Sequence, residues 1–221
     1  MFKKLLTMLA FVSLLVVLPG CPSFTSHQTA EVLDKDKIEW GQSFSTLVIP
    51  ITTHTYDMDG NVTGTKEDTI TLPTLQETLF RFGFNESMDV GIKVTNFFWF
   101  EGDVKFQLMK SGDDTNNFSL AISPSITYSA ALQKYGLSVI ASKRMSGKSV
   151  LYGSLKYNYF AGLDSSNDNL DGFGEGSYFS ASAGFSFEGK KWWLRPEINL
   201  VMNNDFEVAF YSPAIGFGFK F

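Results

Sequence analysis

The chain ends in an alternating stretch, Ala214-Ile215-Gly216-Phe217-Gly218-Phe219-Lys220-Phe221. A period of two over this length predicts a β-strand, because successive side chains of a strand point to opposite faces. One face carries Ile215, Phe217, Phe219 and Phe221, and the other carries small residues and one lysine. In water this strand would expose a row of phenylalanines. Its apolar face must therefore meet either a protein core or lipid.

A strand that ends on an aromatic residue, with apolar residues at every second position before it, resembles the assembly signal of bacterial outer-membrane β-barrel proteins. The resemblance implies a barrel whose signal, Ile215, Phe217, Phe219 and Phe221, is recognised by the outer-membrane assembly machinery. It implies nothing about what the protein does.

The opposite end of the chain indicates a secretory signal peptide over residues 1–20. Lys3 and Lys4 precede an apolar run over residues 5–18, which is shorter than the roughly 20 residues of a membrane-spanning helix. Leu18-Pro19-Gly20-Cys21 resembles a bacterial lipoprotein box, which implies that Cys21 is acylated with palmitate and becomes the new N-terminus. Ordinary cleavage beside an incidental Cys21 is the alternative. We expect residues 21–40 to be a polar periplasmic tether and residues 41–221 to be the barrel.

Charge and cysteine content exclude several classes. The net charge is −5, and loss of Lys3 and Lys4 with the signal would change it to −7, so nucleic acid is not expected as a partner. A single cysteine excludes internal disulfides and paired-cysteine metal sites. After residue 20 the sequence contains no stretch apolar enough for a membrane helix, so any membrane span must consist of strands.

Alternation continues through the chain and predicts about ten strands, with eight or twelve as alternatives. The candidates are residues 42–53, 70–84, 88–98, 101–110, 117–129, 134–143, 149–160, 177–188, 192–202 and 206–221. Segments of this length suit a bilayer, which takes about 9–11 tilted residues per crossing. We therefore expect an all-β protein, a closed antiparallel up-and-down transmembrane β-barrel.

Each of these strands has a second face, opposite its apolar side chains, and the composition of this face distinguishes a membrane barrel from a soluble one. A soluble barrel would cover its outside with charged residues and threonine, whereas here the second face is mostly Ser, Gly and Ala. Such a face suits a crowded interior. Two long polar connections, residues 54–69 and 161–176, lie on the side opposite the short turns, and long loops normally face the cell exterior. Phe221 and the tether then lie at the periplasmic side, which predicts an outer-membrane location with a lipid anchor in the periplasmic leaflet.

Charged residues recur in pairs on the second face of three candidate strands. The pairs are Glu77 with Arg81, Asp89 with Lys93, and Arg195 with Glu197. Facing lipid, a basic side chain would cost about 2–4 kcal/mol at mid-membrane, so we expect these six residues to form a charge network in the lumen. The network is either a salt-bridged filling of a narrow bore or a charge-selective constriction.

Prolines complicate the strand pattern. Pro124 and Pro196 fall inside candidate strands and are expected at bulges, since proline donates no ladder hydrogen bond. Pro50, Pro73 and Pro213 are expected to share one rim of the closed barrel, with weakened pairing over residues 48–54, 70–75 and 209–214. That seam is either a lateral opening or a simply fraying rim.

Other motifs give weaker signals, and we assign no catalytic, cofactor or metal residue. His54 lies beside acidic residues without a recognisable nucleophile. Residues 167–172 resemble half of a calcium loop, and residues 57–61 a turn. Aromatic residues at 97–100 and 192–193 are expected to be interfacial, with a stacking platform for ligands as the alternative.

The expected function is that of a non-enzymatic outer-membrane barrel, either a structural, surface-exposed protein or a porin-like narrow channel for small polar solutes. Its expected surroundings are outer-membrane lipid and lipopolysaccharide. Alternatives are a lipid-modifying outer-membrane enzyme and a lipoprotein with a soluble β-domain that faces the periplasm. The solute and the oligomeric state do not follow from the sequence.

Overall fold

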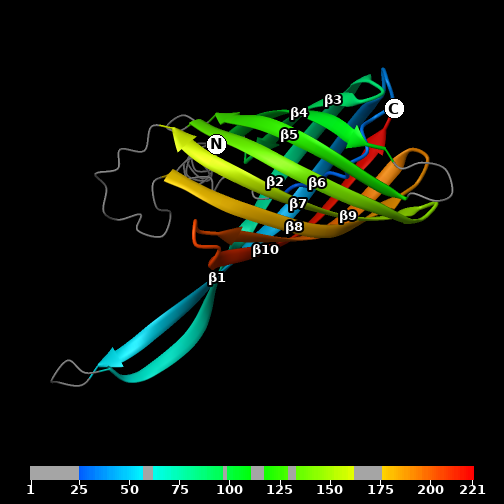
Figure 1. The fold of residues 1–221 in the computed structure, drawn as a ribbon. Coiled ribbons are helices and arrows are strands. Elements are labelled where there is room, and N and C mark those ends of the chain that lie inside the picture. The colour runs from blue at the N-terminus through cyan, green and yellow to red at the C-terminus, as the bar shows by residue number, and fades with distance from the viewer. Residues whose placement is uncertain (1–24, 57–61, 97–98, 111–116, 129–132, 162–175) are drawn as a thin grey trace, which may run out of the picture.

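The computed structural model describes residues 25–56, 62–96, 99–110, 117–128, 133–161 and 176–221 of the 221-residue chain. Within these ranges, no helix is long and apolar enough to cross a membrane. The described residues are almost entirely strands and the connections between them (Figure 1).

The strands form a closed antiparallel barrel in which each strand pairs with its neighbours in sequence and β1 pairs with β10. They are β1 (Ile38–Tyr56), β2 (Val62–Asn85), β3 (Met88–Thr95), β4 (Trp99–Met109), β5 (Phe118–Tyr128), β6 (Gln133–Ser146), β7 (Ser149–Ala161), β8 (Ser177–Glu188), β9 (Trp192–Met202) and β10 (Val208–Lys220). The predicted all-β, up-and-down barrel of about ten strands is confirmed. Most predicted strand ends differ from the observed ones by only a few residues.

The two faces of the barrel wall have opposite chemistry. Large apolar side chains point outward and are exposed, among them Phe82, Phe84, Ile92, Leu137 and Phe185. Charged, hydroxyl and amide side chains point inward and are buried, including Glu77, Asp89, Lys105, Ser123 and Asn199. A water-soluble domain has the reverse arrangement, whereas a membrane barrel has an apolar outer band around a polar interior.

The β1–β10 seam closes the barrel at the end that carries Phe221. Ile38 and Phe221 exchange two backbone hydrogen bonds, of 3.3 and 2.9 Å. On the outer face, Trp40 stacks on Phe219 and Phe44 on Phe217, with ring centroids 6.1 and 6.5 Å apart. The alternating terminal stretch therefore serves as the closing strand.

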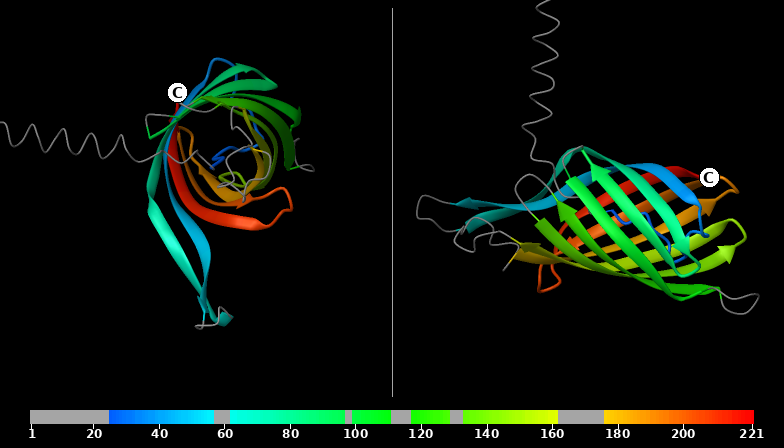
Figure 2. Two further views of the ribbon diagram at one scale, coloured as in Figure 1. Left: turned by 90° about the vertical axis from the view of Figure 1, so that its left-hand side faces the viewer. Right: turned by 90° about the horizontal axis from the view of Figure 1, so that it is seen from above.

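At the other end of the barrel, β1 and β2 continue beyond the wall as a two-stranded ribbon (Figures 1 and 2). The last β1–β10 pair is Val48–Tyr211 and the last β2–β3 pair is Glu77–Thr95, whereas β1 and β2 remain paired as far as Tyr56–Val62. The predicted loop over residues 54–69 is therefore wrong for most of its length. Its threonines favour a strand conformation although the segment buries little apolar surface.

Residues 25–34, which we name the lumen segment, run inside the barrel (Figure 2). Thr25, His27, Thr29 and Ala30 are each at most 5% exposed. The segment leaves the barrel beside Gly83, where a side-chain Cβ would lie 2.0 Å from the carbonyl oxygen of Asp34. This arrangement differs from the expected tether over residues 21–40. The inward small residues leave room that the segment fills.

Three prolines interrupt the ladder without adding a residue. β4–β5 pairing passes from Asp103–Ser125 directly to Phe106–Ile122 around Pro124, and β8–β9 pairing passes from Gly184–Glu197 to Phe187–Leu194 around Pro196. Each gap keeps its register, so the bulges expected at Pro124 and Pro196 are wrong. Because proline lacks the N–H donor, pairs are lost and nothing is inserted. Pro213 interrupts β1–β10 pairing in the same way, opposite Thr46 and Leu47.

Candidate functional site: the polar lumen

The six charged residues predicted for the lumen all point inward and are at most 9% exposed. Glu77 and Arg81 lie on β2, Asp89 and Lys93 on β3, and Arg195 and Glu197 on β9. Among these six, the structure joins Arg81 directly to Asp89. The other four bind partners that the sequence analysis did not single out.

Arg81 is the centre of one group of ion pairs. Besides Asp89 it binds Asp103 through two contacts of 2.8 and 2.6 Å, and Lys105 approaches Asp89 to 3.2 Å. Gly91 makes this possible, since a Cβ there would lie 2.4 Å from Asp103 and 2.5 Å from Arg81. Every charge in this group has an opposite charge beside it, as buried charges require.

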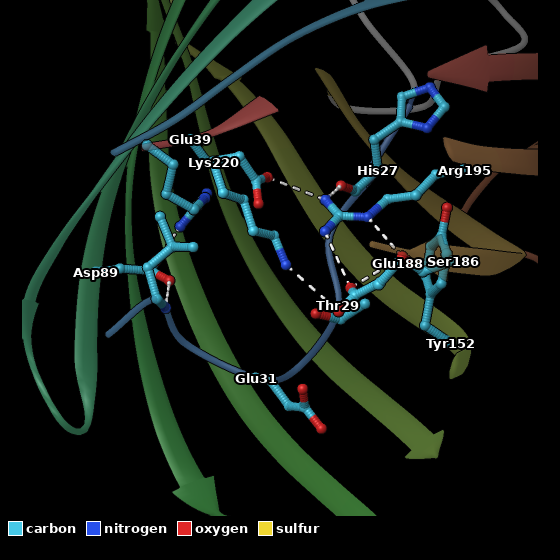
Figure 3. A network of polar contacts seen from close by, with 12 residues as sticks. His27, Thr29, Glu31, Glu39, Asp89, Tyr152, Ser186, Glu188, Arg195 and Lys220 are labelled. Atoms are coloured by element: carbon cyan, nitrogen blue, oxygen red, sulfur yellow. Dashed lines mark hydrogen bonds and ion pairs between the residues drawn. The ribbon is translucent and has the colours of Figure 1, made fainter. Parts of the chain in front are cut away.

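Arg195 is the centre of a second group (Figure 3). It contacts Glu39 at 3.1 Å, Glu188 at 3.5 Å and the hydroxyl of Ser186 at 3.1 Å. Its guanidinium lies 4.2 Å from the ring centroid of Trp193, within the range of a cation–π contact. Lys220 extends the group by a 3.3 Å contact with Glu188.

Glu101 is the centre of a third group, in which three lysines surround one carboxylate. Lys156 lies 2.9 Å from it, and Lys93 and Lys134 each lie 3.6 Å from it. Thr127 donates a further hydrogen bond of 3.0 Å. Alternation alone could have placed Glu101, Lys134 and Lys156 on the inward face, but their convergence depends on barrel closure.

The lumen segment is held by these wall charges through its backbone. Glu197 accepts the N–H groups of Ser26 and His27 at 2.8 and 2.7 Å. Lys105 donates to the carbonyls of Thr29 and Glu31 at 3.1 and 2.7 Å. Further wall contacts are Lys93 with the Thr25 carbonyl, Arg195 with the His27 carbonyl, Asp89 with the Leu33 N–H, Glu77 with the Thr25 hydroxyl and Arg144 with Glu31.

The opposite end of the lumen is apolar. Leu47, Tyr178, Val201 and Phe210 form a buried cluster there, against which Ile49, Leu72 and Phe160 pack. Between this cluster and the Phe221 end, small cavities of about 20 and 50 Å³ lie beside the lumen segment. A cavity needs about 10–15 Å³ to hold one water molecule. Solutes therefore have little room in this conformation.

The weaker motifs of the sequence have mixed outcomes. Phe100 and Trp192 are exposed on the outer face, whereas Trp99 and Trp193 are buried inward, so the interfacial prediction is wrong for the latter two. Cys21 and residues 57–61, 97–98 and 167–172 lie outside the described residues.

Two further findings concern chemistry. His54 Nδ1 lies 3.3 Å from the hydroxyl of Thr65 on the ribbon. Among the described residues, no three His, Cys, Asp or Glu side chains converge in a way that could hold a metal ion.

No protein-family model matches this sequence, and no curated protein sequence matches it either. Solved structures do resemble the fold. An outer membrane channel from Pseudomonas putida F1 is 7% identical, with 89% of this chain and 100% of that chain covered and a TM-score of 0.52. The outer membrane protease OmpT from Escherichia coli (11% identity, 87% and 99% covered) and the NanC porin (9%, 82% and 98%) have TM-scores of 0.45 and 0.43. Of these three, the Pseudomonas putida channel has a TM-score above 0.5, and at 7% identity its likeness shows the fold alone, that of a bacterial outer-membrane β-barrel.

Proposed function

We propose that this protein is a non-enzymatic β-barrel of the bacterial outer membrane, whose polar lumen is a narrow conduit for small polar solutes. In the conformation described, the lumen segment closes this conduit. The exposed apolar outer band and the polar interior support a membrane location, and the Pseudomonas putida structure of similar fold is a channel. The same outer band disfavours a soluble periplasmic β-domain.

The observation that carries the proposal is the way the lumen segment is bound. Its residues join no strand of the wall, and its polar contacts with the wall are to side chains, such as those of Glu197 and Lys105. Ala30 adds an apolar contact with Ala121 and Ile140. A segment held in this way can leave without breaking the β-ladder. A segment whose role was only to fill the lumen permanently could equally well be paired with the strands of the wall.

Conductance in a planar bilayer tests the proposal. We expect wild-type protein to conduct rarely and a variant that lacks residues 25–33 to show frequent current steps. Gly83→Ala should act in the same direction without any deletion, because the new Cβ would collide with the Asp34 carbonyl. Gly102→Ala is the matched control, since a Cβ at Gly102 meets no atom within 4 Å.

A folded deletion variant that passes no current would refute the conduit. It would favour instead the structural, surface-exposed barrel. The migration of unheated and boiled samples in gel electrophoresis shows whether each variant has folded.

We also propose that Cys21 carries palmitate and anchors the protein in the periplasmic leaflet when the lumen segment is outside the barrel. With Thr25 bound to Glu77 inside the lumen, the chain from Thr25 to Cys21 is too short to reach the Phe221 end. The basis is the spacing of Leu18-Pro19-Gly20-Cys21 after the apolar run. Wild-type protein should incorporate labelled palmitate, and Cys21→Ser should incorporate none while it still inserts as a barrel. A wild-type protein without label would refute the anchor and leave the conduit untouched.

A lipid-modifying enzyme is the alternative function that the sequence suggests, and the surroundings of His54 give it little support. The ring of His54 faces a threonine hydroxyl on an exposed ribbon. Phospholipid turnover in mixed micelles that disappears in His54→Ala would establish it.

A further inference from the structure

Wall cations bind every second carbonyl group of the lumen segment from residue 25 to residue 31. Lys93 donates to the carbonyl of residue 25 at 2.9 Å, and Arg195 donates to that of residue 27 at 2.7 Å (Figure 3). Lys105 donates to the carbonyls of residues 29 and 31 at 3.1 and 2.7 Å. These groups belong to the main chain, which every peptide shares.

Wall carboxylates bind N–H groups of the same main chain. Glu197 accepts those of Ser26 and His27, at 2.8 and 2.7 Å, and Asp89 accepts that of Leu33 at 3.0 Å. Hydrogen bonds in which one partner is ionised are stronger than those between neutral groups. The strongest polar contacts of the wall are therefore made with a peptide backbone.

The side chains of the segment contribute few directed contacts. Within the described part of the chain, those of Thr25 and Glu31 bind wall residues. By contrast, neither ring nitrogen of His27 has a hydrogen-bond partner there, and Nδ1 lies 3.9 Å from Glu197. The amide oxygen of Gln28 also has no hydrogen-bond partner there. Recognition thus depends little on the sequence of the segment.

The wall charges that hold the main chain are themselves paired with one another. Arg81 and Lys105 pair with Asp89, and Arg81 also pairs with Asp103. Such a wall favours neither net sign of charge, yet it offers strong donors and strong acceptors side by side. An uncharged chain that carries both kinds of group, as a peptide backbone does, matches it.

We propose that the lumen is a peptide-binding site, and that short peptides are the class of polar solute that it takes in place of its own segment. The inference rests on the proposed function in one respect, the departure of the segment. Ala30 is fully buried and packs with Ala121 and Ile140, so the ligand needs a small side chain at that position.

Fluorescence anisotropy of a labelled peptide measures binding in detergent. The peptide has the sequence of residues 25–33 with both ends blocked, and the protein is the variant that lacks these residues. We expect the variant to bind it at least about tenfold more tightly than wild-type protein, whose own segment competes at a high effective concentration. A folded variant that does not bind the peptide would overturn the proposal.

Ester analogues of the peptide test recognition of the main chain, because an ester oxygen replaces one N–H group without added bulk. Replacement at His27 or Leu33 removes a donor to Glu197 or Asp89 and should weaken binding about tenfold. Replacement at Thr29 is the matched control, since its N–H makes no hydrogen bond within the described ranges. Equal affinities of the three analogues would contradict main-chain recognition.

A peptide with altered side chains tests the second half of the argument. It carries glycine at position 27, where the φ of 44° favours glycine, and alanine at positions 28 and 32. It should bind within about threefold of the original peptide, since these side chains are expected to be near neutral. Loss of binding would show a segment recognised by its own sequence and would overturn the proposal.

If the deletion variant does not fold, full-length Gly83→Ala takes its place, with Gly102→Ala as its control. Gly83→Ala should bind the peptide more tightly, and equal binding by both would contradict the site. These experiments measure no current. A folded variant that binds peptide without conducting would refute the conduit alone, whereas one that conducts and binds no peptide would refute this inference alone.

Discussion

At the scale of single residues, glycines decide where large inward side chains fit. Trp193 lies inside the β1–β10 seam, where Cβ atoms at Gly41, Gly216 and Gly218 would lie 2.4, 3.1 and 2.6 Å from its ring. A Cβ at Gly218 would also lie 2.3 Å from the Trp40 carbonyl oxygen. Backbone cannot move aside as the end of a side chain can, so this position requires glycine.

Gly218→Ala should therefore destabilise the barrel by about 1–3 kcal/mol, the usual cost of overpacking a tight interior. Gly102→Ala is the control, because its new Cβ meets no atom within 4 Å. Urea unfolding of the refolded barrels measures both. Equal midpoints for the two variants would show that Trp193 or the seam relaxes without cost.

The inward positions of residues follow from the sequence more readily than their partners do. The period of two is a local property, so it correctly predicts that Glu77, Arg81, Asp89, Lys93, Arg195 and Glu197 point inward. Partners depend on how strands distant in sequence are staggered around the ring. Lys134 and Glu101, for example, lie on β6 and β4, which are not adjacent, and no local pattern relates them.

At the scale of elements, the pairing of β1 with each of its two neighbouring strands is irregular near Ser45–Leu47. Pro213 interrupts its pairing with β10 opposite Thr46 and Leu47. On the other side, a register shift between Ser45 and Leu47 accommodates Pro73 in β2. Beyond this level β1 and β2 leave the wall as the ribbon, and an isolated two-stranded ribbon is only marginally stable.

We therefore expect fast amide hydrogen exchange at residues 48–54, 70–75 and 209–214, relative to the β5–β6 pair, which is continuous from Phe118–Lys143 to Tyr128–Gln133. Exchange of the detergent-solubilised barrel, followed by mass spectrometry of its peptides, measures the difference. Uniformly slow exchange across this rim would show that the prolines do not weaken the seam.

The ribbon and the lumen segment illustrate why some elements escape prediction from sequence. Residues 63–69 contain no large apolar side chain, so the apolar signal of a strand is weak although most of the backbone pairs with β1. The lumen segment has no periodicity at all. Its conformation is fixed by acceptors and donors on β2, β3, β4 and β9, which come together only when the barrel closes.

At the scale of the whole molecule, the backbone and the ring of Phe221 can be considered separately. Its backbone exchanges two hydrogen bonds with Ile38 at the seam, and its ring is 68% exposed on the outer face. The first concerns closure of the barrel. For the second, we propose that the exposed aromatic ring is recognised by the assembly machinery, as the resemblance of the terminal stretch implies.

Deletion of Phe221 should abolish outer-membrane assembly and lead to degradation in the periplasm, and Phe221→Ser should do nearly the same although its backbone bonds remain possible. Phe84→Ser removes another ring that is 56% exposed and should assemble normally. Fractionation of cells followed by gel electrophoresis of unheated samples measures assembly. Normal insertion of Phe221→Ser would mean that the ring is not a recognition element.

The position of the lumen segment has a consequence for the order of folding. The segment immediately precedes β1, yet the ring around it is complete only when β10 pairs with β1. A chain that closes its ring first must later thread this segment lengthwise past buried ion pairs. A chain that lays the segment across the still open, curved sheet encloses it in the final step. In that order of events the lumen segment, the earliest part of the described chain, is a template on which the later strands assemble.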